Sequence, residues 1–158
     1  MDAAPILNRV ASAFAKARLE AVMIGNAAAA LQGAPVTTMD IDFMVRETRR
    51  NVEKLKEVAE ALDAAFIDAD SPVTSLRKIE REDEGLYLDF LTTVDGVKSF
   101  ESLRSRASKV DFDGSPLWVA ALEDIIASKR ATHRSKDLAA LELLEKTLDE
   151  KRQQKERD

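Results

Sequence analysis

Two aspartates separated by one residue stand at the start of a short apolar segment. Asp40 and Asp42 flank Ile41, and apolar residues follow them. In a β-strand, side chains two positions apart point to the same face, so we expect the two carboxylates to lie side by side. Neighbouring carboxylates repel each other unless a cation lies between them. Hard ions such as Mg²⁺ or Mn²⁺ are bound by this kind of ligand, together with substrate phosphates.

A third aspartate, Asp89, interrupts the apolar run of residues 86–94. An ionised side chain in such a run is costly unless it is paired or bound to a metal. If its strand lies beside that of Asp40 and Asp42, three carboxylates converge, as they do in two-metal phosphoryl transfer. Taken alone, an Asp-x-Asp pair is as readily explained by the acidic pairs that are common at strand ends and in turns as by a metal site. Asp89 alone could be a strand-edge charge that blocks aggregation.

The composition narrows the chemistry that the chain can perform. It has 158 residues, no cysteine, one histidine and a formal net charge of −5. The lack of cysteine excludes disulfides, cysteine–zinc sites and thiolate nucleophiles, and one histidine excludes a multi-histidine metal site within the chain. The apolar runs are far shorter than the about 20 residues of a membrane span, and the first residues do not resemble a signal peptide. We therefore expect a cytoplasmic protein with no membrane partner.

The segments around the aspartates predict a mixed order of helices and strands. A buried strand at 21–24 is followed by Gly25, a short Ala-rich helix at 26–32 and a strand at 41–45. The charged segment 77–84 is expected to be an exposed strand end or loop. Further helices are expected at 3–19, 49–64, 99–107, 122–132 and 136–151, and further strands at 65–69, 86–94, 109–112 and 117–119.

This order predicts an α+β fold, in which a mixed sheet is flanked by helices and more helices follow at the C-terminal end. A chain of this length can bury one sizeable core, so we expect a single domain over residues 1–158. Within it, residues 1–112 would form the core sheet and its helices, and residues 116–151 a helical part. Residues 152–158 are nearly all charged or amide-bearing and are expected to fray.

Cations gather in the acid-free stretch from Ile125 to Lys136. Lys129 lies late in an expected helix, where the helix dipole favours a cation. Lys136 lies at the start of the next helix, where the dipole disfavours a cation, so an anionic partner or the neighbouring Asp137 explains its position better. A second basic cluster either faces a polyanionic acceptor or forms an ordinary solvated helix face. Its members are Lys98, Arg104, Arg106 and Lys109.

The order of strand, Gly25, short helix, connection and Asp40-x-Asp42, with Asp89 on a later strand, resembles the nucleotidyltransferase superfamily, which has the DNA polymerase β-like palm fold. The chain is most similar to small members related to the AbiEii-type abortive-infection toxins. The matching segments read VMIGNAAAALQG at 22–33, TTMDIDF at 37–43 and LYLDFL at 86–91. An acidic pair before Lys129 and a Lys-Asp pair after it extend the resemblance to about residues 20–145.

The resemblance implies a function and a set of site residues. The expected catalytic residues, which also bind Mg²⁺ or Mn²⁺, are Asp40, Asp42 and Asp89. The expected nucleotide-binding residues are Gly25, Asn26, Thr38, Lys129 and Lys136. The implied reaction moves a nucleoside monophosphate from a nucleoside triphosphate to a hydroxyl acceptor such as a tRNA or a protein. The toxin relatives also imply a paired antitoxin.

One position departs from the family pattern. The family's first strand ends in Gly-Gly or Gly-Ser, and Asn26 takes the second position here. In the family this turn holds the β- and γ-phosphates through backbone N–H groups at a helix N-terminus. Asn26 keeps those donors, but its bulkier side chain could crowd the phosphate. The alternative is a catalytically inactive nucleotidyltransferase-fold protein that binds a nucleotide or a partner; a purely structural protein would make the three aspartates a coincidence.

Overall fold

The computed structural model describes residues 4–36, 39–68, 76–132 and 135–157, and within them it has six α-helices, a short 3₁₀ turn and seven strands. The helices span Ala4–Ala17 (α1), Gly25–Leu31 (α2), Arg49–Ala61 (α3), Phe100–Arg106 (α4), Leu122–Thr132 (α5) and Ser135–Arg157 (α6), and the 3₁₀ turn spans Glu82–Glu84 (η1). The strands span Val22–Ile24 (β1), Ile41–Met44 (β2), Ala65–Asp68 (β3), Leu76–Arg81 (β4), Leu86–Leu91 (β5), Ser108–Phe112 (β6) and Ser115–Val119 (β7).

The strands form one mixed sheet in the order β3-β4-β5-β2-β1-β7-β6. β2 runs parallel to β5 and β1 runs parallel to β7, whereas the other neighbouring pairs are antiparallel. The predicted α+β architecture, a mixed sheet flanked by helices, is confirmed. Because β1, β2 and β5 are neighbours at the centre of the sheet, segments that are far apart in the sequence meet there.

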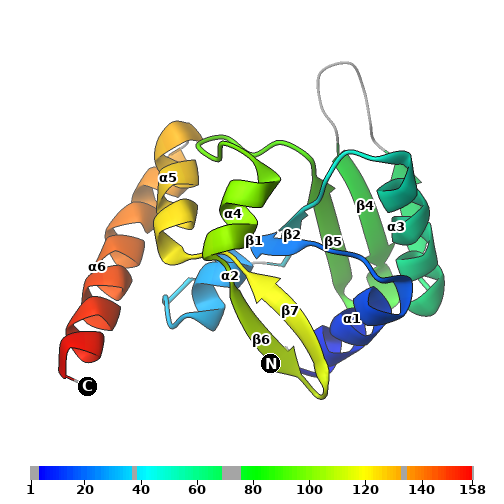
Figure 1. Ribbon diagram of the computed structural model, residues 1–158, viewed down its shortest axis with the longest axis horizontal. Coiled ribbons are helices and arrows are strands. Elements are labelled where there is room, and N and C mark those ends of the chain that lie inside the picture. Colours follow the sequence, from blue (N-terminus) through cyan, green and yellow to red (C-terminus); the bar gives the residue numbers. More distant parts are fainter. Residues whose placement is uncertain (1–3, 37–38, 69–75, 133–134, 158) are drawn as a thin grey trace.

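The helices cover the sheet unevenly. α1 contacts α3, β6 and β7, and α3 also contacts β3 and β4, whereas α5 contacts α2 and α6 at the other end of the molecule from α3 (Figure 1). On the face covered by α1, the rings of Phe14, Phe43 and Phe90 pack with centroids 4.9 to 6.0 Å apart. β5 alternates accordingly, because Leu86, Leu88 and Phe90 are buried while Tyr87, Asp89 and Leu91 on the other face are half-buried.

The charged segment at 77–84 differs from its prediction, because most of it forms β4, a strand with neighbours on both sides. Arg77 and Ile79 lie on the buried face, and Arg77 is only 7% exposed. Its guanidinium lies 3.3 Å from a carboxylate oxygen of Glu47 and 3.6 Å from one of Asp68. An arginine is tolerated in this buried position because carboxylates pair with it. Lys78 projects from the opposite, partly open face.

The C-terminal helix also differs from its prediction. α6 continues to Arg157, whereas fraying was expected from residue 152. The residues of this last segment are mostly Lys, Arg, Gln and Glu, which all favour the helical conformation, so they extend α6 without needing a buried face. None of the helices in the described ranges combines the length and the apolar character that crossing a bilayer requires.

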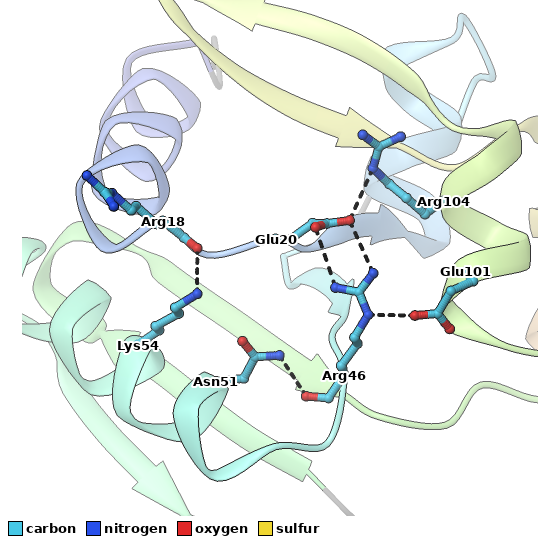
Figure 2. Close-up of polar contacts among 7 residues, drawn as sticks. All are labelled: Arg18, Glu20, Arg46, Asn51, Lys54, Glu101 and Arg104. Atoms are coloured by element: carbon cyan, nitrogen blue, oxygen red, sulfur yellow. Dashed lines mark hydrogen bonds and ion pairs between the residues drawn. The ribbon is translucent and has the colours of Figure 1, made fainter.

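A network of ion pairs joins the α1–β1 connection to the end of β2 and to α4 (Figure 2). Arg46, which follows β2, donates a hydrogen bond of 2.6 Å to Glu101 of α4 and lies 3.4 Å from Glu20 of the connection. Glu20 also lies 3.5 Å from Arg104 of α4. The network lies beyond the C-terminal end of β2, whereas Asp42 lies near the N-terminal end, so it holds α4 on the sheet and takes no part in the candidate site.

Two of the arginines in this network also stack on aromatic rings. The guanidinium of Arg46 lies 4.3 Å from the ring centroid of Phe100, and that of Arg104 lies 3.1 Å from the ring centroid of Trp118. Arg104 belongs to the second basic cluster, which the sequence explained equally well as a surface for a polyanionic acceptor and as a solvated helix face. Its contacts with Glu20 and Trp118 show that this arginine is engaged within the fold.

We expect the Glu101–Arg46 pair to make stability depend on acidity. The hydrogen bond from Arg46 holds the pKa of Glu101 below its ordinary value of 4.5. A lowered folded-state pKa contributes stability above the unfolded pKa and loses it as the pH falls through the folded pKa. Glu101→Gln is therefore expected to lower the melting temperature at pH 7, and its difference from the wild type should shrink as the pH falls below 4.5. A difference that persists unchanged at pH 3 would assign the effect to packing rather than to charge.

Candidate active site

Asp42 and Asp89 lie opposite each other on neighbouring parallel strands. β2 and β5 pair in a register that sets Asp42 beside Asp89, so both side chains project from the same face of the sheet. Asp40 was expected to share this strand face, but β2 begins at Ile41, and Asp40 lies in the bend before it with an exposed side chain. The structure therefore brings Asp42 and Asp89 together, and Asp40 approaches them from the preceding connection.

Gly25 lies against the Asp42 carboxylate. It begins α2 directly after β1, with a φ of +69°, in the left-handed region that favours glycine. A Cβ atom at this position would lie 3.1 Å from Oδ2 of Asp42. Ile24, the preceding residue, pairs with Asp42 across β1 and β2, which fixes this close approach. The backbone conformation therefore favours glycine, and a Cβ would fit only if the carboxylate shifted by a few tenths of an ångström.

We expect Gly25→Ala to lower stability and to disturb Asp42. A left-handed alanine costs about 1–2 kcal/mol, and its Cβ must push Oδ2 aside. Gly33→Ala is the matched control, because Gly33 has a φ of +97° and open space around the position of a Cβ. Thermal unfolding should show a loss for both variants, whereas calorimetric Mn²⁺ binding should weaken only for Gly25→Ala. Equal Mn²⁺ affinity in the two variants would contradict the role of this contact.

Lys78 is a charged residue of the site that the sequence did not reveal. Its Nζ lies 3.3 Å from Oδ1 of Asp89, to which it is paired across β4 and β5. Burial alone would lower the pKa of Lys78, but the Asp89 carboxylate, with smaller contributions from Glu80 and Asp40, outweighs it and raises the pKa. The only sequence signal for Lys78 was the alternation of charged and apolar residues in segment 76–81, and the charged Arg77 on the buried face obscured it.

A cleft of about 600 Å³ opens on this side of the sheet. The predicted site residues among those lining it are Gly25, Asn26, Asp40, Asp42, Asp89 and Lys129. Thr38 lies outside the described residues. Lys136 is the second residue of α6, and its side chain is not among those described. The cleft therefore joins the central strands β1, β2 and β5 to helix α5.

The far wall of the cleft is formed by α5 and by the turn after β5. Asp124, in the first turn of α5, accepts hydrogen bonds of 2.8 and 2.9 Å from Arg106, a second member of the basic cluster, and this raises the pKa of Arg106. Gly96, with a φ of +77°, lies so close to α5 that a Cβ would be 2.5 Å from the carbonyl oxygen of Ala127. These contacts fix α5, and with it Lys129, relative to the carboxylates.

The donor set of the cleft fits a divalent cation that arrives with its nucleotide. Among the described residues, no group of three or more acidic or histidine side chains is close enough together to hold a metal ion by itself. Mg²⁺ in phosphoryl-transfer sites is usually held by one or two carboxylates plus substrate phosphates, not by a protein cage. Asp42 and Asp89 supply two carboxylates in register, and Gly25 leaves space beside Oδ2 of Asp42.

A mixed sheet whose two central parallel strands carry facing aspartates, beside a strand that ends in a glycine turn and a short helix, defines the nucleotidyltransferase class of fold. The chain belongs to the family described as nucleotidyl transferases of unknown function (DUF2204), whose profile matches residues 3–157. The predicted resemblance to the superfamily is thereby confirmed, and the family is one of transferases. A search of curated proteins by sequence returned no match.

Solved structures with low sequence identity share this fold. The antibiotic-resistance factor ANT(2'')-Ia is 17% identical, with a TM-score of 0.63 over 94% of this chain and 86% of its own. A candidate nucleotidyltransferase from Thermotoga maritima is 18% identical, with a TM-score of 0.58 over 92% of both chains. The lincosamide antibiotic adenylyltransferase LnuA is 12% identical, with a TM-score of 0.57 over 84% of this chain and 89% of its own.

Proposed function

We propose that the chain transfers a nucleoside monophosphate from a nucleoside triphosphate to a hydroxyl acceptor, with Mg²⁺ or Mn²⁺ bound by Asp40, Asp42 and Asp89. The observation that carries this proposal is the in-register pairing of Asp42 with Asp89 beside the close approach of Gly25. Carboxylates that face each other at a cleft repel unless a cation joins them. A divalent cation between Asp42 and Asp89 would offset this repulsion, and the proposed reaction uses such a cation.

The proposed reaction breaks a phosphoanhydride bond of the nucleoside triphosphate and forms a phosphoester bond to the acceptor. The acceptor oxygen bonds to the α-phosphorus, the bond from that phosphorus to the oxygen bridging to the β-phosphorus breaks, and pyrophosphate leaves. Asp89 accepts the proton of the acceptor hydroxyl. When bound, the divalent cations supply alignment of the triphosphate and stabilisation of the charge that develops on its oxygens.

The remaining assigned residues bind the triphosphate. The backbone N–H groups of the Gly25-Asn26 turn contact its phosphates, and the Lys129 ammonium offsets the charge of the departing pyrophosphate. Lys129 lines the same cleft as the carboxylates, which supports this role. Thr38 and Lys136 are assigned to nucleotide binding from the family resemblance alone.

The acceptor is proposed from the resemblance to AbiEii-type toxins, which favours a tRNA or a protein and a paired antitoxin. Two of the structural neighbours were solved with small molecules bound, ANT(2'')-Ia with adenylyl-2''-tobramycin and LnuA with lincomycin. Small hydroxylated molecules therefore belong in the same test.

The experiment is a transfer assay with the full chain. The protein is incubated with each α-³²P-labelled nucleoside triphosphate, Mg²⁺ and, in separate reactions, total RNA, total protein or a panel of small hydroxylated molecules. Transfer of label that requires the divalent cation and is lost in Asp42→Asn supports the proposal. No cation-dependent transfer to any acceptor class would contradict it.

The alternative function, nucleotide or partner binding without catalysis, is favoured by Asn26 at the position of the family's second Gly or Ser. Asn26 lines the cleft beside Gly25, in the turn that is proposed to contact the phosphates. Calorimetric titration with nucleotide and Mg²⁺ separates the two functions: binding without turnover in the transfer assay supports the alternative. Asn26→Ser, which restores the family residue, should then confer transfer if Asn26 alone blocks it.

A further inference from the structure

Lys78 contacts a carboxylate oxygen that the proposed metal ion would also bind. The Lys78 ammonium lies 3.3 Å from Oδ1 of Asp89, in a row that crosses the sheet from β4 through Asp89 of β5 to Asp42 of β2. A divalent ion bound to that oxygen at about 2.1 Å would lie within about 5.5 Å of the lysine Nζ. At this distance the positive charges repel each other strongly in a partly buried site.

The two side chains of the pair differ in their freedom to move. The Asp89 side chain is only 17% exposed, whereas that of Lys78 is 32% exposed, so the carboxylate is fixed within the sheet and the lysine reaches it from the rim. A long, flexible lysine can leave such a contact without any change in the backbone. Lys78 can therefore move to another anion, whereas Asp89 cannot.

We propose that Lys78 is a positioning residue that occupies Asp89 in the nucleotide-free protein and yields it to a divalent cation when a triphosphate offers the ammonium another anion. The inference rests on the proposed metal site. It makes completion of that site depend on the nucleotide, so the carboxylates do not hold a full set of cations before substrate arrives.

The test measures Mn²⁺ binding to the full chain by electron paramagnetic resonance of the free ion, first without nucleotide. Lys78→Gln is expected to bind Mn²⁺ about threefold to tenfold more tightly than the wild type, because the competing charge is gone. Lys78→Arg should resemble the wild type, since it keeps the charge. With a non-hydrolysable triphosphate present, the wild type should gain affinity and the difference from Lys78→Gln should shrink.

Two controls make the result specific to the Asp89 contact. Lys56→Gln removes the same charge from α3, where the ammonium lies 5.7 Å from the ring of Phe66, and should leave Mn²⁺ affinity unchanged. In an Asp89→Asn background, Lys78→Gln should give no gain. A gain that survives in that background, or an affinity of Lys78→Gln equal to or weaker than that of the wild type, overturns the inference.

The outcome is distinguishable from the fate of the proposed function. Tighter Mn²⁺ binding by Lys78→Gln with no turnover on any acceptor would support the competition between Lys78 and the cation and contradict the proposed transferase activity. Turnover by the wild type with no change of Mn²⁺ affinity in Lys78→Gln would support the proposed transferase activity and contradict the competition between Lys78 and the cation.

Discussion

Asp42→Asn should lower the rate of nucleotidyl transfer by about 10²–10³-fold or more, the loss expected when one group that stabilises developing charge is removed. Asparagine keeps the size of the side chain but loses the charge that binds a divalent cation. The same change removes the repulsion between Asp42 and Asp89, which lie in register on neighbouring strands. The melting temperature should therefore stay unchanged or rise while activity falls.

Asp113→Asn is the matched control for this substitution. It makes the same change in charge on the turn between β6 and β7, where Asp113 has a φ of +54° that asparagine also tolerates. Its rate and melting temperature should equal those of the wild type. If Asp42→Asn retains a rate within a fewfold of the control, Asp42 is not a ligand of the reactive cation. A matched fall in rate and stability would indicate a structural role instead.

Gly96→Ala should destabilise the fold by about 2–4 kcal/mol, which combines left-handed strain with overpacking. The new Cβ would lie 2.5 Å from the carbonyl oxygen of Ala127 and 3.0 Å from Cα of Ser128. Both are backbone atoms, so the clash is relieved only when the turn after β5 moves away from α5. Because α5 carries Lys129, transfer activity should fall even where the variant remains folded.

Denaturant unfolding followed by circular dichroism measures the loss of stability, and the transfer assay at a temperature well below the unfolding midpoint measures the activity. Gly114→Ala is the control, because Gly114 has a φ of +93° and open space around the position of a Cβ. The Gly114→Ala variant has the backbone strain without the steric clash, so its free energy of unfolding should lie between those of the wild type and Gly96→Ala. Equal stability of the two variants would show that the turn accommodates a Cβ beside α5.

The architecture could be predicted because its main signals are local in the sequence. The strand at 21–24, Gly25, the short helix and Asp40-x-Asp42 follow one another within about twenty residues, and each part predicts its own conformation. The mixed sheet and the nucleotidyltransferase class that this order indicated are confirmed. The roles of the individual site residues remain predictions, which the substitutions above test.

The strand register is what the sequence could not reveal. Nothing in the residues themselves shows that β5 pairs with β2, so the approach of Asp89 to Asp42 rested on the family resemblance until the structure supplied it. Lys78 was missed for the same reason, because its meeting with Asp89 depends on how β4 pairs with β5. For Arg106 the sequence left a polyanionic acceptor and a solvated helix face both open, because its partner, Asp124, lies on another helix.

The parallel pairing of β1 with β7 has a consequence for the time at which the protein can fold during synthesis. Val22 pairs with Trp118, so one edge of β1 has no neighbour until the ribosome has made nearly a hundred further residues. At about 5–20 residues per second, this interval lasts roughly 5–20 s. A nascent chain therefore exposes an unpaired apolar strand edge, which is prone to aggregation, before the sheet can close. Interruptions of translation within that interval should yield aggregates rather than partly active protein.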